Sequence, residues 1–145
     1  MTDTNRLTDK VAVITGGGSG IGKGASLRIA EEGAAVAIFE IRLPLAEAVA
    51  AELNDSGGRA VAIACDVAEE TQVASAIATT VDRFGKVTSL LANAGTAGRG
   101  WIHETAIEDW NFVLGVNLTG PFLCAKYRIP HMIAAGTASI VVTSS

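Results

Sequence analysis

Residues 11–22 read Val-Ala-Val-Ile-Thr-Gly-Gly-Gly-Ser-Gly-Ile-Gly, an apolar run of strand length that passes directly into a glycine-rich turn. Five of the seven residues from Gly16 to Gly22 are glycine, and residues 23–32 then mix apolar and polar positions as a helix packed on a sheet does. The stretch therefore predicts a strand, a tight turn and a helix. Free backbone N–H groups and the positive end of the helix dipole would attract an anion to the start of that helix.

Glycine is expected in this turn for two reasons. Some positions must adopt a positive φ, and others must let a pyrophosphate approach the backbone with no Cβ in the way. Residues 17–23 also fit the P-loop pattern G-x-x-x-x-G-K, but Gly24 follows where a P-loop requires Ser or Thr to bind magnesium. We therefore interpret the turn as a dinucleotide site, with a loop that merely turns as the alternative.

The spacing Thr15-Gly16-x-x-x-Gly20-x-Gly22 resembles the glycine signature of the short-chain dehydrogenase/reductase family. The resemblance implies that this loop holds a nicotinamide dinucleotide cofactor. The cofactor-binding residues that it implies here are Gly16, Ser19, Gly20, Ile21 and Gly22.

A second apolar strand is predicted over residues 35–39, and it ends at Glu40. A carboxylate at this place in a dinucleotide-binding unit accepts hydrogen bonds from the adenosine ribose. Because it would also repel a 2′-phosphate, Glu40 favours NAD over NADP, and Ser19, where a basic residue would suit NADP, agrees. Arg42 lies close enough to weaken this preference, and a solvated strand end is the alternative interpretation of Glu40.

A helix is predicted over residues 43–54 and a third strand over residues 60–65, which leads to Asp66 and Val67. A carboxylate at this strand end could accept a hydrogen bond from an adenine amino group, or it could cap the helix predicted over residues 68–84. The Cys-Asp-Val segment also resembles the short-chain dehydrogenase/reductase family, in which the acidic residue and its neighbour flank the adenine.

A fourth strand is predicted over residues 87–92, directly before Asn93, Ala94 and Gly95. These residues resemble the family motif Asn-Asn-Ala-Gly, with Ala92 in place of its first asparagine. The resemblance implies that Asn93 steadies the sheet beside the cofactor and that the two small residues allow close passage of the nicotinamide ribose.

A loop over residues 96–105 contains the isolated Trp101, which is either a packing anchor or a contact to the substrate. A long helix is predicted from residue 106 through residue 120, with a bend at Pro121. Asn117 lies among apolar residues of this helix, so it must be hydrogen-bonded or linked to water.

The run Val-Asn-Leu-x-Gly-x-Phe around Asn117 resembles the family's helix whose asparagine holds a water molecule in the proton relay. A fifth strand is predicted over residues 140–143, and two serines follow it. By the same resemblance the second of them, Ser145, is the active-site serine. Ser145 and Asn117 are therefore the catalytic residues that the sequence implies.

The alternation of strands and helices predicts an α/β fold, a Rossmann-type doubly wound parallel sheet with strand order 3-2-1-4-5. With 145 residues, residues 1–145 are expected to form a single dinucleotide-binding domain. The family's Tyr-x-x-x-Lys pair, which would follow Ser145, does not occur, and Tyr127 has no lysine four positions later. The domain is therefore expected to be incomplete at its C-terminus and truncated after the fifth strand.

The net charge of −4 provides no basic patch for nucleic acid or an anionic membrane. No apolar run reaches the ~18 residues of a membrane span, and the polar N-terminus lacks the apolar core of a signal peptide. Cys65 and Cys124 are expected to be reduced thiols, and His103 and His131 form no metal-ligand spacing. We expect a cytoplasmic protein with no metal, nucleic-acid or membrane partner.

The resemblance implies reversible hydride transfer between NAD and a small-molecule alcohol or its ketone or aldehyde, with NADP less favoured. The alternative is a non-catalytic dinucleotide-binding module. A serine hydrolase is disfavoured because the chain has no G-x-S-x-G elbow. Since members of the family are commonly dimers or tetramers, a homo-oligomer is also expected.

Residues 1–145 taken alone are predicted to be inactive. Ser145 and Asn117 match only part of the family's active site, and no tyrosine and lysine pair follows them to take the proton of the substrate. Purified residues 1–145 should therefore give no reduction of NAD with a panel of alcohols and sugars. Turnover by a monodisperse preparation would contradict this prediction.

Overall fold

The computed structural model describes residues 5–144. These residues form a five-stranded sheet with the spatial order β3-β2-β1-β4-β5. Every strand pairing in it is parallel, as in the pairing of β1 with β2 that sets Val11 opposite Ala35. The strands are β1 (Val11–Thr15), β2 (Ala35–Glu40), β3 (Arg59–Ala64), β4 (Ser89–Ala92) and β5 (Ser139–Val142).

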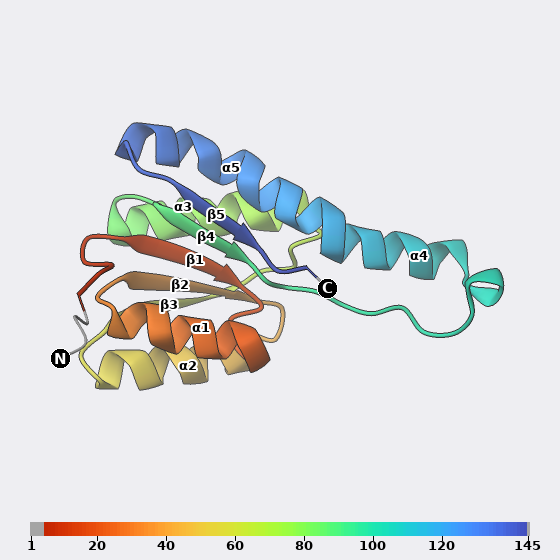
Figure 1. Cartoon of the computed structure of the whole chain (residues 1–145), viewed down its shortest axis with the longest axis horizontal. Coiled ribbons are helices and arrows are strands. Elements are labelled where there is room, and N and C mark those ends of the chain that lie inside the picture. The colour runs from red at the N-terminus through yellow and green to blue at the C-terminus, as the bar shows by residue number, and fades with distance from the viewer. Residues whose placement is uncertain (1–4, 145) are drawn as a thin grey trace.

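Helices lie on both faces of the sheet (Figure 1). One face carries α1 (Gly20–Glu31) and α2 (Leu43–Asp55), and the other carries α3 (Glu70–Phe84) and α5 (Gly120–Ala135). This arrangement confirms the predicted Rossmann-type doubly wound fold and its strand order.

Strands β1 and β2, both in the interior of the sheet, are buried along their whole length. Because successive side chains of a strand point to opposite faces, each strand feeds two cores. Val13 and Phe39 pack in the core that includes residues of α3 and α5, whereas Ile14 and Ile38 pack in the core that includes residues of α2. The continuous apolar runs of the sequence therefore reflect burial on both faces.

The helix predicted through residues 106–120 is divided in the structure. A short 3₁₀ helix, η1 (Ile102–Glu104), precedes α4 (Ile107–Leu114), and a π-helical turn, η2 (Gly115–Thr119), joins α4 to α5. Pro121 has no N–H to donate and its ring crowds the carbonyl of the preceding turn. The bend expected at this proline is therefore accommodated by widening the turn before it.

Strand β5 pairs with β4 at the edge of the sheet, and its apolar side chains are exposed. Arg128 of α5 is fully buried and reaches this strand, where its Nη2 donates to the carbonyl of Ser139 at 2.8 Å and contacts the sulfur of Met132. Burial lowers the pKa of Arg128 to about 10, so the guanidinium stays charged near neutral pH. This buried cation ties the first residue of β5 to α5.

The start of the described chain is joined to the end of α1 by a carboxylate between two guanidinium groups. Glu32 accepts hydrogen bonds from Arg6 at 2.7 and 2.9 Å and a further one from Arg28. The hydrogen bond from Arg6 and the nearby charge of Arg28 lower the pKa of Glu32 from 4.5 to about 2.

A group whose pKa is lowered by folding stabilises the protein above its unfolded pKa, and this contribution disappears as the pH falls through the folded value. The free energy of unfolding should therefore decline between pH 4.5 and about 2, in part because of Glu32. Glu32→Gln should lower stability at neutral pH and flatten this decline in urea unfolding experiments. Glu31→Gln, at an exposed carboxylate that pairs with Arg28, is the control, and an equal flattening by both variants would contradict the assignment.

Candidate dinucleotide site

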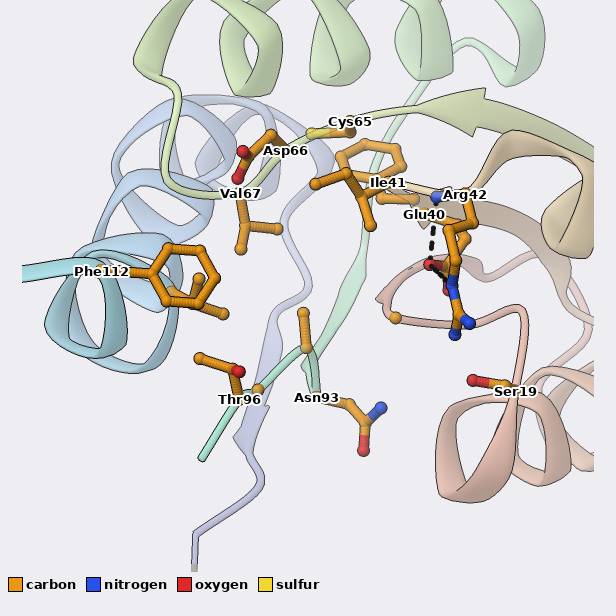
Figure 2. A pocket seen from close by; sticks show the side chains of 15 residues that line it. Ser19, Glu40, Ile41, Arg42, Cys65, Asp66, Val67, Asn93, Thr96 and Phe112 are labelled. Carbon is orange, nitrogen blue, oxygen red and sulfur yellow. Dashed lines mark hydrogen bonds and ion pairs between the residues drawn. The ribbon is translucent and has the colours of Figure 1, made fainter. Parts of the chain in front are cut away.

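A cavity of about 330 Å³ opens at the edge of the sheet where the carboxyl ends of β1, β2, β3 and β4 meet (Figure 2). Of the residues predicted to bind a cofactor, those that line it are Gly16, Ser19, Glu40, Asp66, Val67, Asn93, Ala94 and Gly95. The other three, Gly20, Ile21 and Gly22, begin α1 and do not line it. The topology thus brings together residues from four separate strand ends.

The glycine turn is compact, and Gly16 and Gly22 illustrate two reasons why its backbone requires glycine. Gly16 has a φ of +64°, and its N–H donates to the carbonyl of Phe39 at 2.8 Å. A Cβ on Gly22 would lie only 2.1 Å from the carbonyl oxygen of Gly16 and 2.7 Å from Nδ2 of Asn93. Any larger residue at position 22 would therefore collide with the backbone of the glycine turn itself.

The start of α1 presents backbone donors. Its first turn lies three residues earlier than the sequence predicted, and Lys23 donates to the carbonyl of Ser19 at 3.0 Å. The amides of residues 20–22 precede this intrahelical bond and are thus the orphan donors of a helix N-terminus, which suit a phosphate.

Ser26 is a residue that the sequence analysis missed. Its side chain is fully buried on α1, and its Oγ donates to the carbonyls of Gly22 at 2.9 Å and Gly17 at 3.3 Å. The sequence signal that could have identified it is a serine four residues after Gly22, one helical turn away on the same face of the helix. Ser26 fastens the glycine turn to the helix that follows it.

Glu40 is buried, with 5% of its surface exposed, so it is not a solvated strand end. Its Oε2 accepts a hydrogen bond from the N–H of Gly18 at 3.3 Å, and its Oε1 accepts one from the N–H of Arg42 at 3.3 Å. The guanidinium of Arg42 lies 3.9 Å from the same carboxylate. At the end of β2 the Glu40 carboxylate therefore contacts the glycine turn, and the Arg42 guanidinium beside it partly offsets its negative charge.

Asp66 does not cap α3, because the N-cap residue of that helix is Glu69, which makes no side-chain cap hydrogen bond. Oδ1 of Asp66 accepts a hydrogen bond from the N–H of Ala68 at 2.9 Å, and its own N–H donates to Oε1 of Gln72 at 2.9 Å. These bonds order the turn between β3 and α3. The side chain also lines the cavity, beside Val67 (Figure 2).

Asn93 connects three strand ends. The Oγ1 of Thr15 accepts hydrogen bonds from the N–H groups of Asn93 and Ala94, both at 2.9 Å. The side chain of Asn93 donates to the carbonyl of Thr15 at 3.3 Å and accepts a bond from Oγ1 of Thr143 at 3.2 Å. Asn93 thus lies between the glycine turn after β1 and the segment after β5, and the parts of Thr15 and Thr143 in this network were not foreseen.

Asn117 is hydrogen-bonded, as its apolar sequence context required. Its Nδ2 donates to the carbonyl of Thr96 at 2.8 Å, and its Oδ1 accepts from the N–H of Thr96 at 2.8 Å. Both ends of the amide therefore hold the backbone that leaves β4. Asn117 itself does not line the cavity, whereas its neighbour Val116 and its partner Thr96 do. The other predicted catalytic residue, Ser145, lies outside the described residues.

The cavity wall also contains residues that the sequence analysis did not assign to a site. They are mostly apolar: Phe39, Ile41, Cys65, Phe112 and Val116, together with Arg42 and Thr96. Burial raises the pKa of the Cys65 thiol to about 12, and Cys124 nearby adds to this effect. Both cysteines are free and buried, so Cys65 is an apolar part of the wall and not a nucleophile near neutral pH.

Among residues 5–144, no group of three or more His, Cys, Asp and Glu side chains is arranged to hold a metal ion. No helix in the same part is long and apolar enough to cross a bilayer.

A parallel sheet of this order, with a glycine turn between its first strand and first helix, belongs to the Rossmann-type class of doubly wound folds. Residues 10–145 match the sequence profile of the short chain dehydrogenase family. Because this match spans nearly the whole chain, the chain belongs to the short-chain dehydrogenase/reductase family.

Relatives with stated activities include a 2,5-dichloro-2,5-cyclohexadiene-1,4-diol dehydrogenase of Sphingobium indicum, 43% identical over 97% of this chain and 56% of its own length. A cyclohexanol dehydrogenase of an Acinetobacter species is 38% identical over 98% of this chain and 57% of its own length. The crystal structure of a 3-ketoacyl-ACP reductase from Sinorhizobium meliloti superposes with a TM-score of 0.91 at 37% identity, covering 93% of this chain and 53% of that protein. The chain thus spans little more than half the length of these relatives.

Substitution by alanine should have opposite effects on stability at Gly22 and Gly24, because only Gly22 is closely packed. Gly22→Ala should lower the free energy of unfolding by about 1–3 kcal/mol or more, because the new Cβ would overlap the carbonyl of Gly16. Gly24→Ala, where a Cβ meets nothing within 4 Å, should raise it by about 0.5–1 kcal/mol through helix propensity. Urea unfolding of both variants measures this difference, and similar effects of the two substitutions would refute it.

Proposed function

We propose that the chain is the dinucleotide-binding part of an NAD-dependent oxidoreductase that interconverts an alcohol and a ketone or aldehyde. The single observation that carries this proposal is the cavity, in which the glycine turn, Glu40, Asp66 and the backbone after Asn93 face one space. The stated activities of the two dehydrogenases described above support the same reaction class.

The residues present fit a dinucleotide. The backbone amides at the start of α1 suit a pyrophosphate, the Glu40 carboxylate suits ribose hydroxyls, and Asp66 suits the polar edge of an adenine. The cavity volume of about 330 Å³ lies within the range of small-molecule sites. When bound, NAD accepts the hydride through its nicotinamide ring.

The chain's own groups position the reactants. Asn117 holds the backbone of Thr96 at the cavity wall, and Ser145 would donate a hydrogen bond to the substrate oxygen. The single tyrosine does not take part, because the hydroxyl of Tyr127 donates to Glu70 at 2.7 Å and does not line the cavity. A general base from the family's Tyr-x-x-x-Lys motif is not among residues 1–145.

Because Tyr127 lies outside the cavity, it cannot take the proton of a substrate bound there. A dinucleotide-binding module without catalysis is therefore the second candidate. The two candidates are separated by mixing the natural gene product with NAD and cyclohexanol and following NADH formation, beside an NADH titration. Binding with no turnover across a wide alcohol panel would favour the module, and absence of NADH binding would overturn both.

We further propose a cytoplasmic homo-oligomer. The two free, buried thiols suit a reducing compartment. Apolar side chains are also exposed on one helix, where Phe122 is 61%, Ile129 42% and Ile133 75% exposed. Clusters of exposed apolar side chains on soluble proteins commonly mark surfaces that bind another chain.

The choice of NAD over NADP is attributed to the charge of Glu40. Glu40→Gln retains the size of the side chain and an acceptor for Gly18, but it removes the negative charge that repels a 2′-phosphate. The ratio of the NADP to the NAD dissociation constant should therefore fall by about tenfold or more, since each factor of ten corresponds to about 1.4 kcal/mol.

The same titrations on Arg42→Ala provide the control, because this variant removes the cation beside Glu40 and should disfavour NADP further. Tighter binding of NADP by the natural sequence, or an unchanged ratio in Glu40→Gln, would refute the assignment.

A further inference from the structure

Arg128 is a fully buried cation that lacks a full set of hydrogen-bond acceptors. Its Nη2 donates to the carbonyl of Ser139 at 2.8 Å and contacts the sulfur of Met132. Its Nε and Nη1 have no hydrogen-bond partner among residues 5–144. A guanidinium carries five N–H donors, and buried donors without a partner are unfavourable. The interior between α5 and β5 is therefore short of acceptor atoms.

Met132 is the side chain placed to supply a further acceptor. Its sulfur already contacts Nη2 of Arg128, but a thioether is only a weak acceptor. Oxidation would add an oxygen atom to that sulfur and convert an apolar side chain into a polar one. The new oxygen would lie within reach of the guanidinium, and hydrogen bonds to a charged donor are stronger than those between neutral groups.

A small oxidant can approach this sulfur from the surface. Met132 is 3% exposed, but it lines a groove of about 330 Å³ beside α5 and β5, together with Ile133 and Ile140. Both of these apolar side chains are exposed, so the groove faces solvent. Hydrogen peroxide is small and uncharged, and it therefore suits entry into an apolar groove.

The thiols of the same core do not compete for the oxidant near neutral pH. Burial raises the pKa of Cys124 to about 11, an effect that the charge of Arg128 offsets only in part. Burial likewise raises the pKa of Cys65 to about 12. A thiol reacts as its thiolate, whereas a thioether needs no deprotonation. Met132 is therefore the sulfur of this core that a peroxide would oxidise first.

We propose that Met132 is a site of reversible oxidation whose sulfoxide is bound inside the fold by the guanidinium of Arg128. Neither residue lines the dinucleotide cavity, so this inference is independent of the proposed function.

The oxidant is hydrogen peroxide or an organic hydroperoxide. The lone pair of the Met132 sulfur attacks the terminal oxygen of the peroxide, an S–O bond forms and the O–O bond breaks. The proton on the transferred oxygen passes to the departing oxygen, so the thioether loses two electrons and the peroxide is reduced to water or an alcohol. The N–H groups of Arg128 stabilise the negative charge that develops during this step. A methionine sulfoxide reductase restores the thioether and oxidises two thiols to a disulfide.

The first test treats the full chain with millimolar hydrogen peroxide and follows each sulfur by peptide mass mapping. Met132 should gain one oxygen while Cys65 and Cys124 remain thiols. Arg128→Leu should slow this oxidation by roughly tenfold, the size of one hydrogen bond to a charged group. This variant should fold, because an apolar side chain replaces a buried charge that has no counterion. Circular dichroism checks that it does.

Urea unfolding distinguishes a bound sulfoxide from a chance lesion. In the natural sequence, oxidation should leave the urea midpoint unchanged or raise it, because the new oxygen meets a charged donor. In Arg128→Leu the same oxidation buries a sulfoxide without a partner, so it should lower the midpoint. Met132→Leu, which has a similar volume, is the matched control and should not change on treatment with peroxide.

A third measurement needs no variant. Oxidation makes the sulfur chiral, and only one of its two lone pairs can direct the oxygen at Arg128. The Met132 peptide from the oxidised chain should therefore be reduced by one of the two methionine sulfoxide reductases, which act on opposite epimers, and not by the other.

Four results would overturn the proposal. They are an absence of Met132 oxidation in the folded chain, an equal rate in Arg128→Leu, an equal fall in the urea midpoint of both proteins on oxidation, and an equal mixture of the two epimers.

Discussion

The close approach of Gly22 to the carbonyl of Gly16 is the contact on which the site depends. With a Cβ position only 2.1 Å from that oxygen, the first turn of α1 lies directly on the end of β1. This contact directs the helix start, and therefore its unpaired amides, toward the carboxyl edge of the sheet. The acidic residue of β2 then faces the same turn, because Glu40 accepts the N–H of Gly18.

A second set of hydrogen bonds joins this turn to the later strands. Asn93 contacts Thr15 at the end of β1 and Thr143 after the end of β5. Thr143 is two residues before Ser145, the predicted active-site serine. One asparagine side chain thus joins the glycine turn after β1 to the segment that follows β5.

The sequence predicted the sheet well because its signal is burial. β1 and β2 are mainly apolar and are buried on both faces, so their positions followed from the apolar runs of the sequence. The strand order followed from the alternation of strands and helices. Glu40 and Asp66 were found for a similar reason, since each is a carboxylate at the end of an apolar strand. Parallel strand ends converge, and this rule brings such residues together without knowledge of side-chain detail.

The residues that were missed depend on contacts for which the sequence carries at most a weak local signal. Ser26 resembles any polar residue of an amphipathic helix until the helix is placed on the glycine turn. Phe112 lies in the long helix predicted over residues 106–120 and was not singled out there, and α4 buries none of its residues. Helical periodicity assumes one continuous register, and the widened turn at Gly115–Thr119 changes the register between Phe112 and the buried face of α5.

The π-helical turn at Gly115–Thr119 contributes both to the cavity wall and to the position of the loop after β4. The π-helical turn precedes Pro121, whose missing N–H and ring disfavour regular α-helical bonding there. It carries both Val116, which lines the cavity, and Asn117, which holds Thr96. A regular helix through this region would rotate the residues before the proline relative to those after it. α4 has no buried side chain of its own, and the helix that continues from it is held by the two hydrogen bonds of Asn117 and by the close packing of Gly120 on Val67. This departure from regular helical geometry therefore allows Phe112 of α4 and Val116 of the π-helical turn to line the cavity together.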